Sequence, residues 1–130
     1  MKILTVFLLV HFYVPTISAA GPTRLIDQAP DSASARINPL QGDERDLSAG
    51  AKLFARECSA CHGKVGEGYN SAPPLRSRVI AEAPAGILFW ALRNGSRRRG
   101  MPSFAHLPET QRWQIITYLK AMQNKTIQKP

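Results

Sequence analysis

Apolar residues recur at helical spacing in two segments in the middle of the chain. The first segment starts at Leu47-Ser48, where Ser48 can cap a helix that runs towards Cys58. The second starts near Pro84, a residue suited to a first helical turn, and ends at Asn94-Gly95. Because apolar residues cover most of the second segment, we expect that helix to be well buried. The apolar positions are Ala51, Leu53, Phe54 and Ala55 in the first segment and Ile87, Leu88, Trp90, Ala91 and Leu92 in the second.

A third helix is predicted near the C-terminal end, opening with Pro108-Glu109, both favourable in a first turn. Its apolar positions at helical spacing are Trp113, Ile116 and either Tyr118 or Leu119. Glycines and the run Pro73-Pro74-Leu75 mark a long loop after the first helix, and residues 96–104 form another before the third. No strand-like alternation of useful length interrupts this pattern. The predicted fold class is therefore all-α, a small domain of three or more helices with long loops.

The N-terminal end has the three-part pattern of a secretory signal. Met1-Lys2 is followed by a mostly apolar stretch over residues 3–14, then Pro15 and the small residues Ser18-Ala19-Ala20. We expect residues 1–20 to be removed by cleavage after Ala20 or after Ala19. The alternative is an uncleaved membrane anchor, although the apolar run is shorter than the ~20 residues that span a bilayer. The protein is therefore predicted to be exported, in a bacterium to the periplasm.

The remaining sequence divides into three parts. Residues 21–46 are rich in proline and polar residues without periodicity, so they are predicted to form a flexible N-terminal extension, either a tether or a strap over the domain. Residues 47–123 form the single folded domain, and residues 124–130 are a C-terminal tail.

Positive charge is concentrated in the folded part. The formal net charge is +8, with 17 basic and 9 acidic residues, and from residue 47 onward 13 Lys or Arg face 4 Glu. Such a surface attracts nucleic acid, anionic membrane or an acidic protein. Export and the lack of a recognised nucleic-acid motif exclude nucleic acid, which leaves an acidic protein partner or a membrane surface. The sequence does not define an oligomeric state.

Cys58-Ser59-Ala60-Cys61-His62 is a C-x-x-C-H motif, the attachment site of a c-type haem. Two thiols separated by two residues at the end of a helix can reach both vinyl groups of one porphyrin. The imidazole of His62 then lies beneath the iron as its proximal ligand. Three alternatives are open. A disulfide fits an oxidising compartment, but so short a loop gives it little entropic gain. A zinc site would have to recruit His62 and His106 at an unusual spacing, and a thioredoxin-like redox pair needs a βαβ unit that the sequence lacks.

The run Gly50-Ala51-Lys52-Leu53-Phe54-Ala55-Arg56-Glu57-Cys58-Ser59-Ala60-Cys61-His62-Gly63 resembles the opening helix of the class I cytochromes c, the mitochondrial-type and bacterial family. The resemblance covers about residues 47–123 and implies one covalently bound haem c. It also implies that Gly50 and Phe54 on this helix pack against Tyr118 on the C-terminal helix.

The second axial ligand is expected to be Met101, because a methionine thioether is a common partner of histidine in electron-transfer haems. Without Met1, only Met101 and Met122 remain, and the run Gly100-Met101-Pro102 resembles the distal loop of the same family. Met122, on the last helix, is expected to pack there or to be partly exposed. His106 is the rival ligand, with a surface position as its alternative.

Pro73-Pro74-Leu75 resembles the proximal loop of the family, in which a proline carbonyl accepts the Nδ1 hydrogen of the ligating histidine. The resemblance favours Pro73 over Pro74, and a rigid turn without a haem role is the alternative.

The densest charge cluster, Arg97-Arg98-Arg99 with Arg93 before it, directly precedes Met101. It could be a solvated face, a docking site for an acidic partner, or a source of hydrogen bonds to a haem propionate.

Together these features predict an exported mono-haem cytochrome that transfers single electrons between redox proteins, such as a dehydrogenase or an oxidase, and that has no catalytic residues of its own. The main alternative is a fixed cytochrome subunit of a larger exported dehydrogenase. Another is a haem sensor or peroxidase in which Met101 is displaced and the iron is open.

Overall fold

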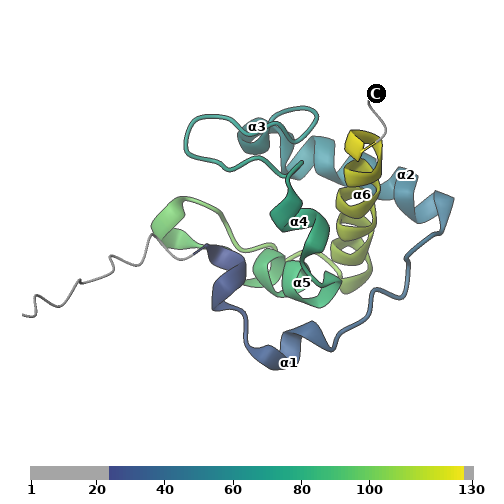
Figure 1. The fold of residues 1–130 in the computed structure, drawn as a ribbon, viewed down its shortest axis with the longest axis horizontal. Coiled ribbons are helices and arrows are strands. Elements are labelled where there is room, and N and C mark those ends of the chain that lie inside the picture. The colour runs from purple at the N-terminus through teal and green to yellow at the C-terminus, as the bar shows by residue number, and fades with distance from the viewer. Residues whose placement is uncertain (1–23, 128–130) are drawn as a thin grey trace, which may run out of the picture.

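The computed structural model describes residues 24–127, and the predicted signal sequence lies outside them. Figure 1 shows helices and loops packed around the long C-terminal helix. The all-α prediction is confirmed: within the described residues, paired extended backbone occurs only at the isolated bridges Tyr69–Ala72 and Ser96–Met101. The elements are η1 (Leu25–Gln28), α1 (Asp31–Ser34), α2 (Glu44–Glu57), α3 (Ser59–His62), α4 (Arg78–Glu82), α5 (Ala85–Asn94), η2 (Arg97–Arg99) and α6 (Glu109–Ile127).

Helices α2 and α6 cross in close contact at Gly50. A Cβ atom at Gly50 would lie 2.0 Å from the backbone oxygen of Gln114 and 3.0 Å from the Cβ of Tyr118. One turn further along α2, the ring of Phe54 lies 5.3 Å from that of Tyr118, centroid to centroid, in a tilted arrangement. The absent side chain at Gly50 therefore allows the two helices to approach until their aromatic residues meet.

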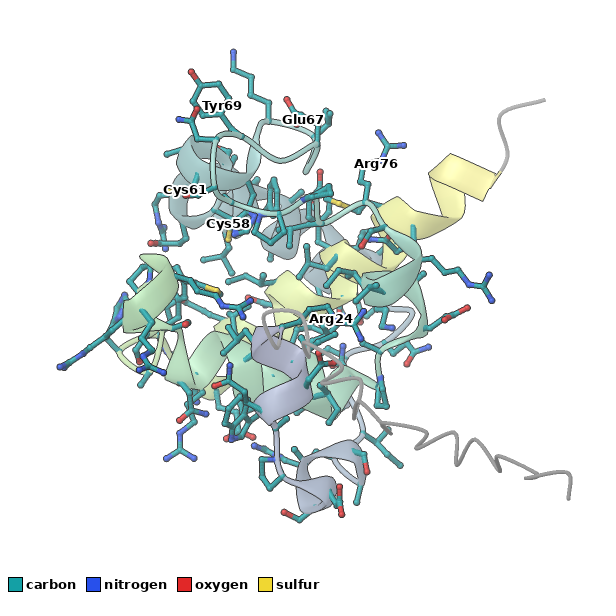
Figure 2. The ribbon with its side chains drawn as sticks, turned by 60° about the vertical axis from the view of Figure 1, so that its left-hand side comes forward. Arg24, Cys58, Cys61, Glu67, Tyr69 and Arg76 are labelled. Carbon is teal, nitrogen blue, oxygen red and sulfur yellow. The ribbon has the colours of Figure 1, made fainter. Side chains whose placement is uncertain are left out.

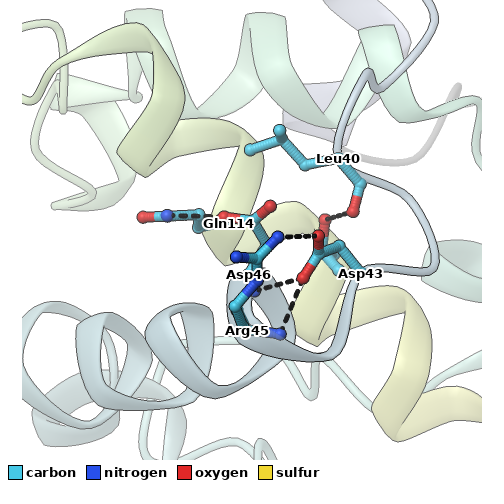
Figure 3. Close-up of polar contacts among 6 residues, drawn as sticks. Leu40, Asp43, Arg45, Asp46 and Gln114 are labelled. Carbon is cyan, nitrogen blue, oxygen red and sulfur yellow. Dashed lines mark hydrogen bonds and ion pairs between the residues drawn. The ribbon is translucent and has the colours of Figure 1, made fainter.

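The N-cap of helix α2 lies five residues before Ser48, the cap that the sequence pattern predicts. Its N-cap is Asp43, whose Oδ1 accepts hydrogen bonds from the backbone N–H groups of Arg45 (2.8 Å) and Asp46 (3.4 Å) (Figure 3). The side chain of Gln114 on α6 donates to Asp46 at 2.8 Å. An aspartate satisfies the free N–H groups of a first turn as well as Ser48 would, so residues 44–48 become helical.

The core consists of two clusters, and α6 contributes residues to both. Leu75 packs against both. The first cluster contains Leu53, Phe54, Cys58, Leu92, Phe104, Leu107, Ile115, Leu119 and Met122, and the second contains Ile80, Ala83, Leu88, Phe89, Trp113 and Ile116. Both Tyr118 and Leu119 contribute to the first cluster: Leu119 is buried, and Tyr118 is partly buried against it.

Residues 24–43, called the strap below, lie against α5 and α6. A Cβ at Gly86 on α5 would lie 2.0 Å from the backbone oxygen of Ala33, so the strap backbone rests directly on that helix. The buried side chain of Asn38 donates to Thr117 on α6 at 2.9 Å. The guanidinium of Arg36 lies 4.2 Å from the centre of the Phe89 ring. These are single long-range contacts without periodicity, which is why the hydrophobic pattern does not reveal them.

Helix α6 continues to Ile127, four residues beyond the predicted domain end at residue 123. Within residues 24–127, none of the helices combines the length and the apolar character that crossing a membrane requires. The short helices α3 and α4 were not predicted, because four or five residues are too few to show a helical period.

The crossing of α2 and α6 predicts that Gly50→Ala destabilises the fold. The added methyl group would overlap the Gln114 carbonyl, so the helices must move apart, and we expect a loss of about 3 kcal/mol in the free energy of unfolding. Denaturant unfolding of the haem-loaded protein measures this change. Ser48→Ala, on an exposed position of the same helix, is the control and should stay within about 0.5 kcal/mol of wild type; equal stability of the two variants would contradict a close crossing.

Candidate functional site

Helix α2 carries the motif to the edge of the first cluster. Cys58 is both the C-cap of α2 and the N-cap of α3, and its backbone N–H donates to the carbonyl of Phe54 at 2.9 Å. Helix α3 holds Cys61 and His62 in one turn, which ends at Gly63 with a φ of 83°. Figure 2 shows Cys58 and Cys61 close together, below the loop that carries Glu67 and Tyr69. The single turn of α3 and its N-cap therefore carry both cysteines and the histidine.

The two thiols differ in environment, and neither takes part in a disulfide. Cys58 is buried in the first cluster, and burial, followed by the nearby Glu57 and Cys61, raises the pKa of its thiol to about 12. Cys61 is exposed. Within residues 24–127 no three His, Cys, Asp or Glu side chains gather as a metal site, so the described residues do not assemble the ligands of the zinc alternative.

The ring of His62 is oriented by a backbone carbonyl. Its Nδ1 lies 2.9 Å from the carbonyl oxygen of Pro73. A carbonyl can only accept, so the bond requires the hydrogen on Nδ1 and leaves the lone pair on Nε2. This is the tautomer in which a histidine binds a metal through Nε2 while a second group fixes its plane.

The loop of residues 63–75 folds back on itself to bring Pro73 to His62. Gly68 donates its N–H to the carbonyl of His62 at 2.8 Å, and the backbone N–H of Leu75 bonds to the carbonyl of Gly66 at 2.8 Å. A Cβ at Gly68, whose φ is 84°, would lie 3.2 Å from the carbonyl carbon of Pro73. Gly68 thus lets the two arms of the loop touch, which sets the position of the Pro73 carbonyl.

Glu67 stabilises the turn that follows His62. Its Oε2 accepts the backbone N–H of Val65 at 2.9 Å, and its carboxyl group lies over Gly63. Hydrogen bonds from its own backbone N–H and from that of Val65 hold the pKa of Glu67 below its usual range. The carboxylate is thus bound in its charged form by the turn that it caps.

Met101 lies in a second loop, which is bonded to α5. The backbones of Ser96 and Met101 exchange two hydrogen bonds of 2.8 and 3.0 Å, and Phe104 donates its N–H to the carbonyl of Leu92 at 3.0 Å. Gly95 is required where this loop closes, because its φ is 63° and a Cβ would lie 2.5 Å from the carbonyl carbon of Pro102. The side chain of Met101 is partly buried against the first cluster, which also contains Cys58.

The other predicted site residues lie on the surface or in the core. His106 is exposed, with its ring 6.1 Å from that of Phe104, and Met122 is buried in the first cluster. Arg93 and the three arginines of η2 are exposed. The structure therefore brings Met101, and not His106, onto the cluster that holds Cys58.

The donors present fit a haem. Two thiols lie one helical turn apart, the adjacent imidazole has its Nδ1 engaged and its Nε2 available, and a thioether contacts the apolar cluster that buries one of the thiols. A porphyrin is a large apolar ring that requires such a surface, and iron accepts imidazole nitrogen together with thioether sulfur.

Glu67 and Arg112 are two residues of this region that the sequence did not single out. Glu67 stands between two glycines, and Arg112 is a lone charge beside Trp113 on the apolar side of α6. In each case the sequence holds a clue, because a charged residue stands among small residues in the loop or among apolar residues in the helix.

Comparisons with known proteins agree with this geometry. The family described as cytochrome C oxidase, cbb3-type, subunit III matches residues 45–119. The chain is also 34% identical over 94 residues to quinohemoprotein alcohol dehydrogenase ADH-IIG of Pseudomonas putida. That similarity covers 71% of this chain and 12% of the dehydrogenase, so the chain spans only a small part of the length of that relative.

The turn capped by Glu67 predicts a pH-dependent stability. The depressed pKa means that the carboxylate stabilises the fold above its unfolded-state pKa, and that this contribution disappears as the pH falls through the folded-state pKa. Glu67→Gln should be less stable than wild type at neutral pH and equally stable in acid, as measured by denaturant midpoints at several pH values. Glu82→Gln, which removes an exposed carboxylate on α4, is the control; a gap between wild type and Glu67→Gln that stays constant with pH would contradict this role.

Proposed function

The chain belongs to the family of cytochrome c domains that is named after subunit III of the cbb3-type cytochrome c oxidase. We therefore propose that it is an exported carrier of single electrons with one covalently bound haem. Cytochrome c domains transfer electrons and are not themselves catalytic. The observation that carries the proposal is the hydrogen bond of 2.9 Å between Nδ1 of His62 and the carbonyl oxygen of Pro73. His62 directly follows the second cysteine of the motif. The bond prepares His62 for a metal in a motif whose spacing suits a porphyrin.

Each residue of the site has one role in this proposal. Cys58 and Cys61 would hold the haem through thioether bonds, and His62 would bind its iron through Nε2 in the orientation that Pro73 sets. Met101 would be the second protein ligand of the iron; its contact with the first cluster and the exposure of His106 favour it over the histidine. The haem, when bound, would supply the one-electron chemistry. Two protein ligands would leave no position for substrate on the iron, which favours a carrier over the peroxidase and sensor alternatives.

Export is supported by the apolar N-terminal stretch and by the covalent mode of attachment, and in a bacterium it places the carrier in the periplasm. Residues 1–20 lie outside the described part of the structure.

A fixed cytochrome subunit is the second candidate function, because the relative with 34% identity is a dehydrogenase in which the matching segment is a small part. Copurification separates the two functions. When the protein is purified from the soluble extract of its own organism, a carrier should be recovered alone, whereas a subunit should be recovered together with a large dehydrogenase.

Loss of the cysteines tests the haem assignment. Cys58→Ala and Cys61→Ala should each reduce the haem that remains bound after denaturation and extraction into acidic solvent, and the double variant should retain none, because thioether bonds alone survive this treatment. Mass spectrometry of the extracted chain measures the result and counts the haems. Ala60→Ser, which changes the spacer without touching a donor, is the control; full haem retention in the double variant would refute covalent attachment.

The arginine cluster is proposed to dock an acidic redox protein. Neutralising Arg97, Arg98 and Arg99 to glutamine should slow reduction by an acidic partner by about 10-fold at low salt and by little at high salt, where charges are screened. Stopped-flow mixing measures the rate. The control removes the same charge elsewhere, with Lys52→Gln, Arg45→Gln and Arg78→Gln. If the reduction rate depends on salt equally in the two triple variants, the arginine cluster is only a solvated face and does not dock a partner.

A further inference from the structure

Arg112 is a buried cation in the first turns of α6. Its relative exposure is 8%, and within residues 24–127 no carboxylate forms an ion pair with it. Its guanidinium lies 4.9 Å from the centre of the Phe89 ring, and its Nε has no hydrogen-bond partner. Burying an arginine without a counter-charge is costly, so the groups that it does bind must compensate for most of the lost hydration.

Those groups are backbone carbonyls of the segment that follows Met101. The Nη1 of Arg112 donates to the carbonyl oxygens of Leu107 (2.9 Å), Ala105 (3.1 Å) and Phe104 (3.4 Å). One guanidinium nitrogen thus gathers three carbonyls that lie three to six residues after Met101. The Phe104 carbonyl also accepts the backbone N–H of Leu107 at 3.1 Å.

The other end of the same segment is bonded to α5. Phe104 donates its backbone N–H to Leu92, and the Ser103 hydroxyl donates to the Arg93 carbonyl at 2.5 Å. The loop that carries Met101 is therefore fixed on both sides, to α5 through backbone and hydroxyl groups and to α6 through Arg112. Of these contacts, the Arg112 bonds are the ones made by a charged side chain, and hydrogen bonds to charged groups are the stronger class.

We propose that Arg112 is a positioning residue that holds the Met101 loop closed on the first cluster, so that the Met101 thioether resists displacement from the iron by external ligands. The inference rests on the proposed function, because it takes Met101 as the axial ligand. Arg112 touches neither ligand nor iron in this account; it acts through the backbone of residues 104–107.

Arg36, in the strap of residues 24–43, contacts the same aromatic ring as Arg112. Its guanidinium lies over the Phe89 ring that Arg112 also faces, and its Nη2 forms an ion pair with Glu109 at 2.7 Å. The strap thus completes the packing around the aromatic ring on which Arg112 rests, in a segment that lies before the family match at residues 45–119.

Competition by imidazole tests the proposal on the haem-loaded protein. The variants are Arg112→Leu, which removes all three bonds, and Arg112→Lys, which keeps the charge but lacks the planar fork. The matched control is Lys120→Leu, because Lys120 also lies on α6 and also donates to three carbonyls, those of Ile80, Ala81 and Ala83 on and after α4. The affinity of the oxidised protein for imidazole is measured by absorption titration at one pH, together with the far-red absorption band of a thioether bound to ferric haem.

We expect imidazole to bind about 10-fold more tightly to Arg112→Leu than to wild type, and the thioether band to weaken without added ligand. Arg112→Lys should lie between the two, and it carries the test if Arg112→Leu does not retain its fold. Lys120→Leu should lose stability in denaturant yet bind imidazole like wild type.

Two results would overturn the inference while leaving Met101 ligation intact. One is an unchanged imidazole affinity in both Arg112 variants, and the other is an equal increase in Lys120→Leu, which would show a general loss of stability. Absence of the thioether band in the wild-type protein is a separate outcome; it would remove the Met101 assignment itself, and the positioning role with it.

Discussion

The close crossing of α2 and α6 at Gly50 is the contact on which the rest of the molecule depends. Because a backbone carbonyl of α6 occupies the place of a side chain there, the two helices meet along Phe54 and Tyr118. The end of α2 then lies in the first cluster, with Cys58 buried and His62 one turn further on. The same contact fixes α6, whose Arg112 reaches the second loop.

The two loops of the site are held in different ways. Residues 63–75 are held by local bonds among their own backbone groups, with Glu67 at the turn, so the position of His62 depends on short-range geometry. The loop of Met101 is held by groups from two helices, α5 and α6. The position of His62 therefore depends on hydrogen bonds within its own loop, whereas the position of Met101 depends on how α5 and α6 pack.

Sequence reasoning predicted the features that have a local period or a fixed spacing. The all-α class, the helices ending near Cys58 and Gly95, and the start of the last helix at Glu109 follow from periodicity and caps. The packing of Phe54 against Tyr118 followed from the resemblance around the motif. What the sequence did not reveal depends on contacts between distant segments: the bonds that attach residues 24–43 to α5 and α6, the N-cap of α2 at Asp43, and Arg112 in the core. A single asparagine or arginine has no period, and its partner can be known only once the helices are placed.

A carbon monoxide difference spectrum of the reduced, haem-loaded protein tests the central claim most directly. If His62 and Met101 both bind the iron in a closed electron-transfer site, the reduced spectrum keeps sharp low-spin bands and carbon monoxide leaves it unchanged. A rapid shift of the bands on addition of carbon monoxide would contradict the account, because it would mean that the sixth position of the iron is open.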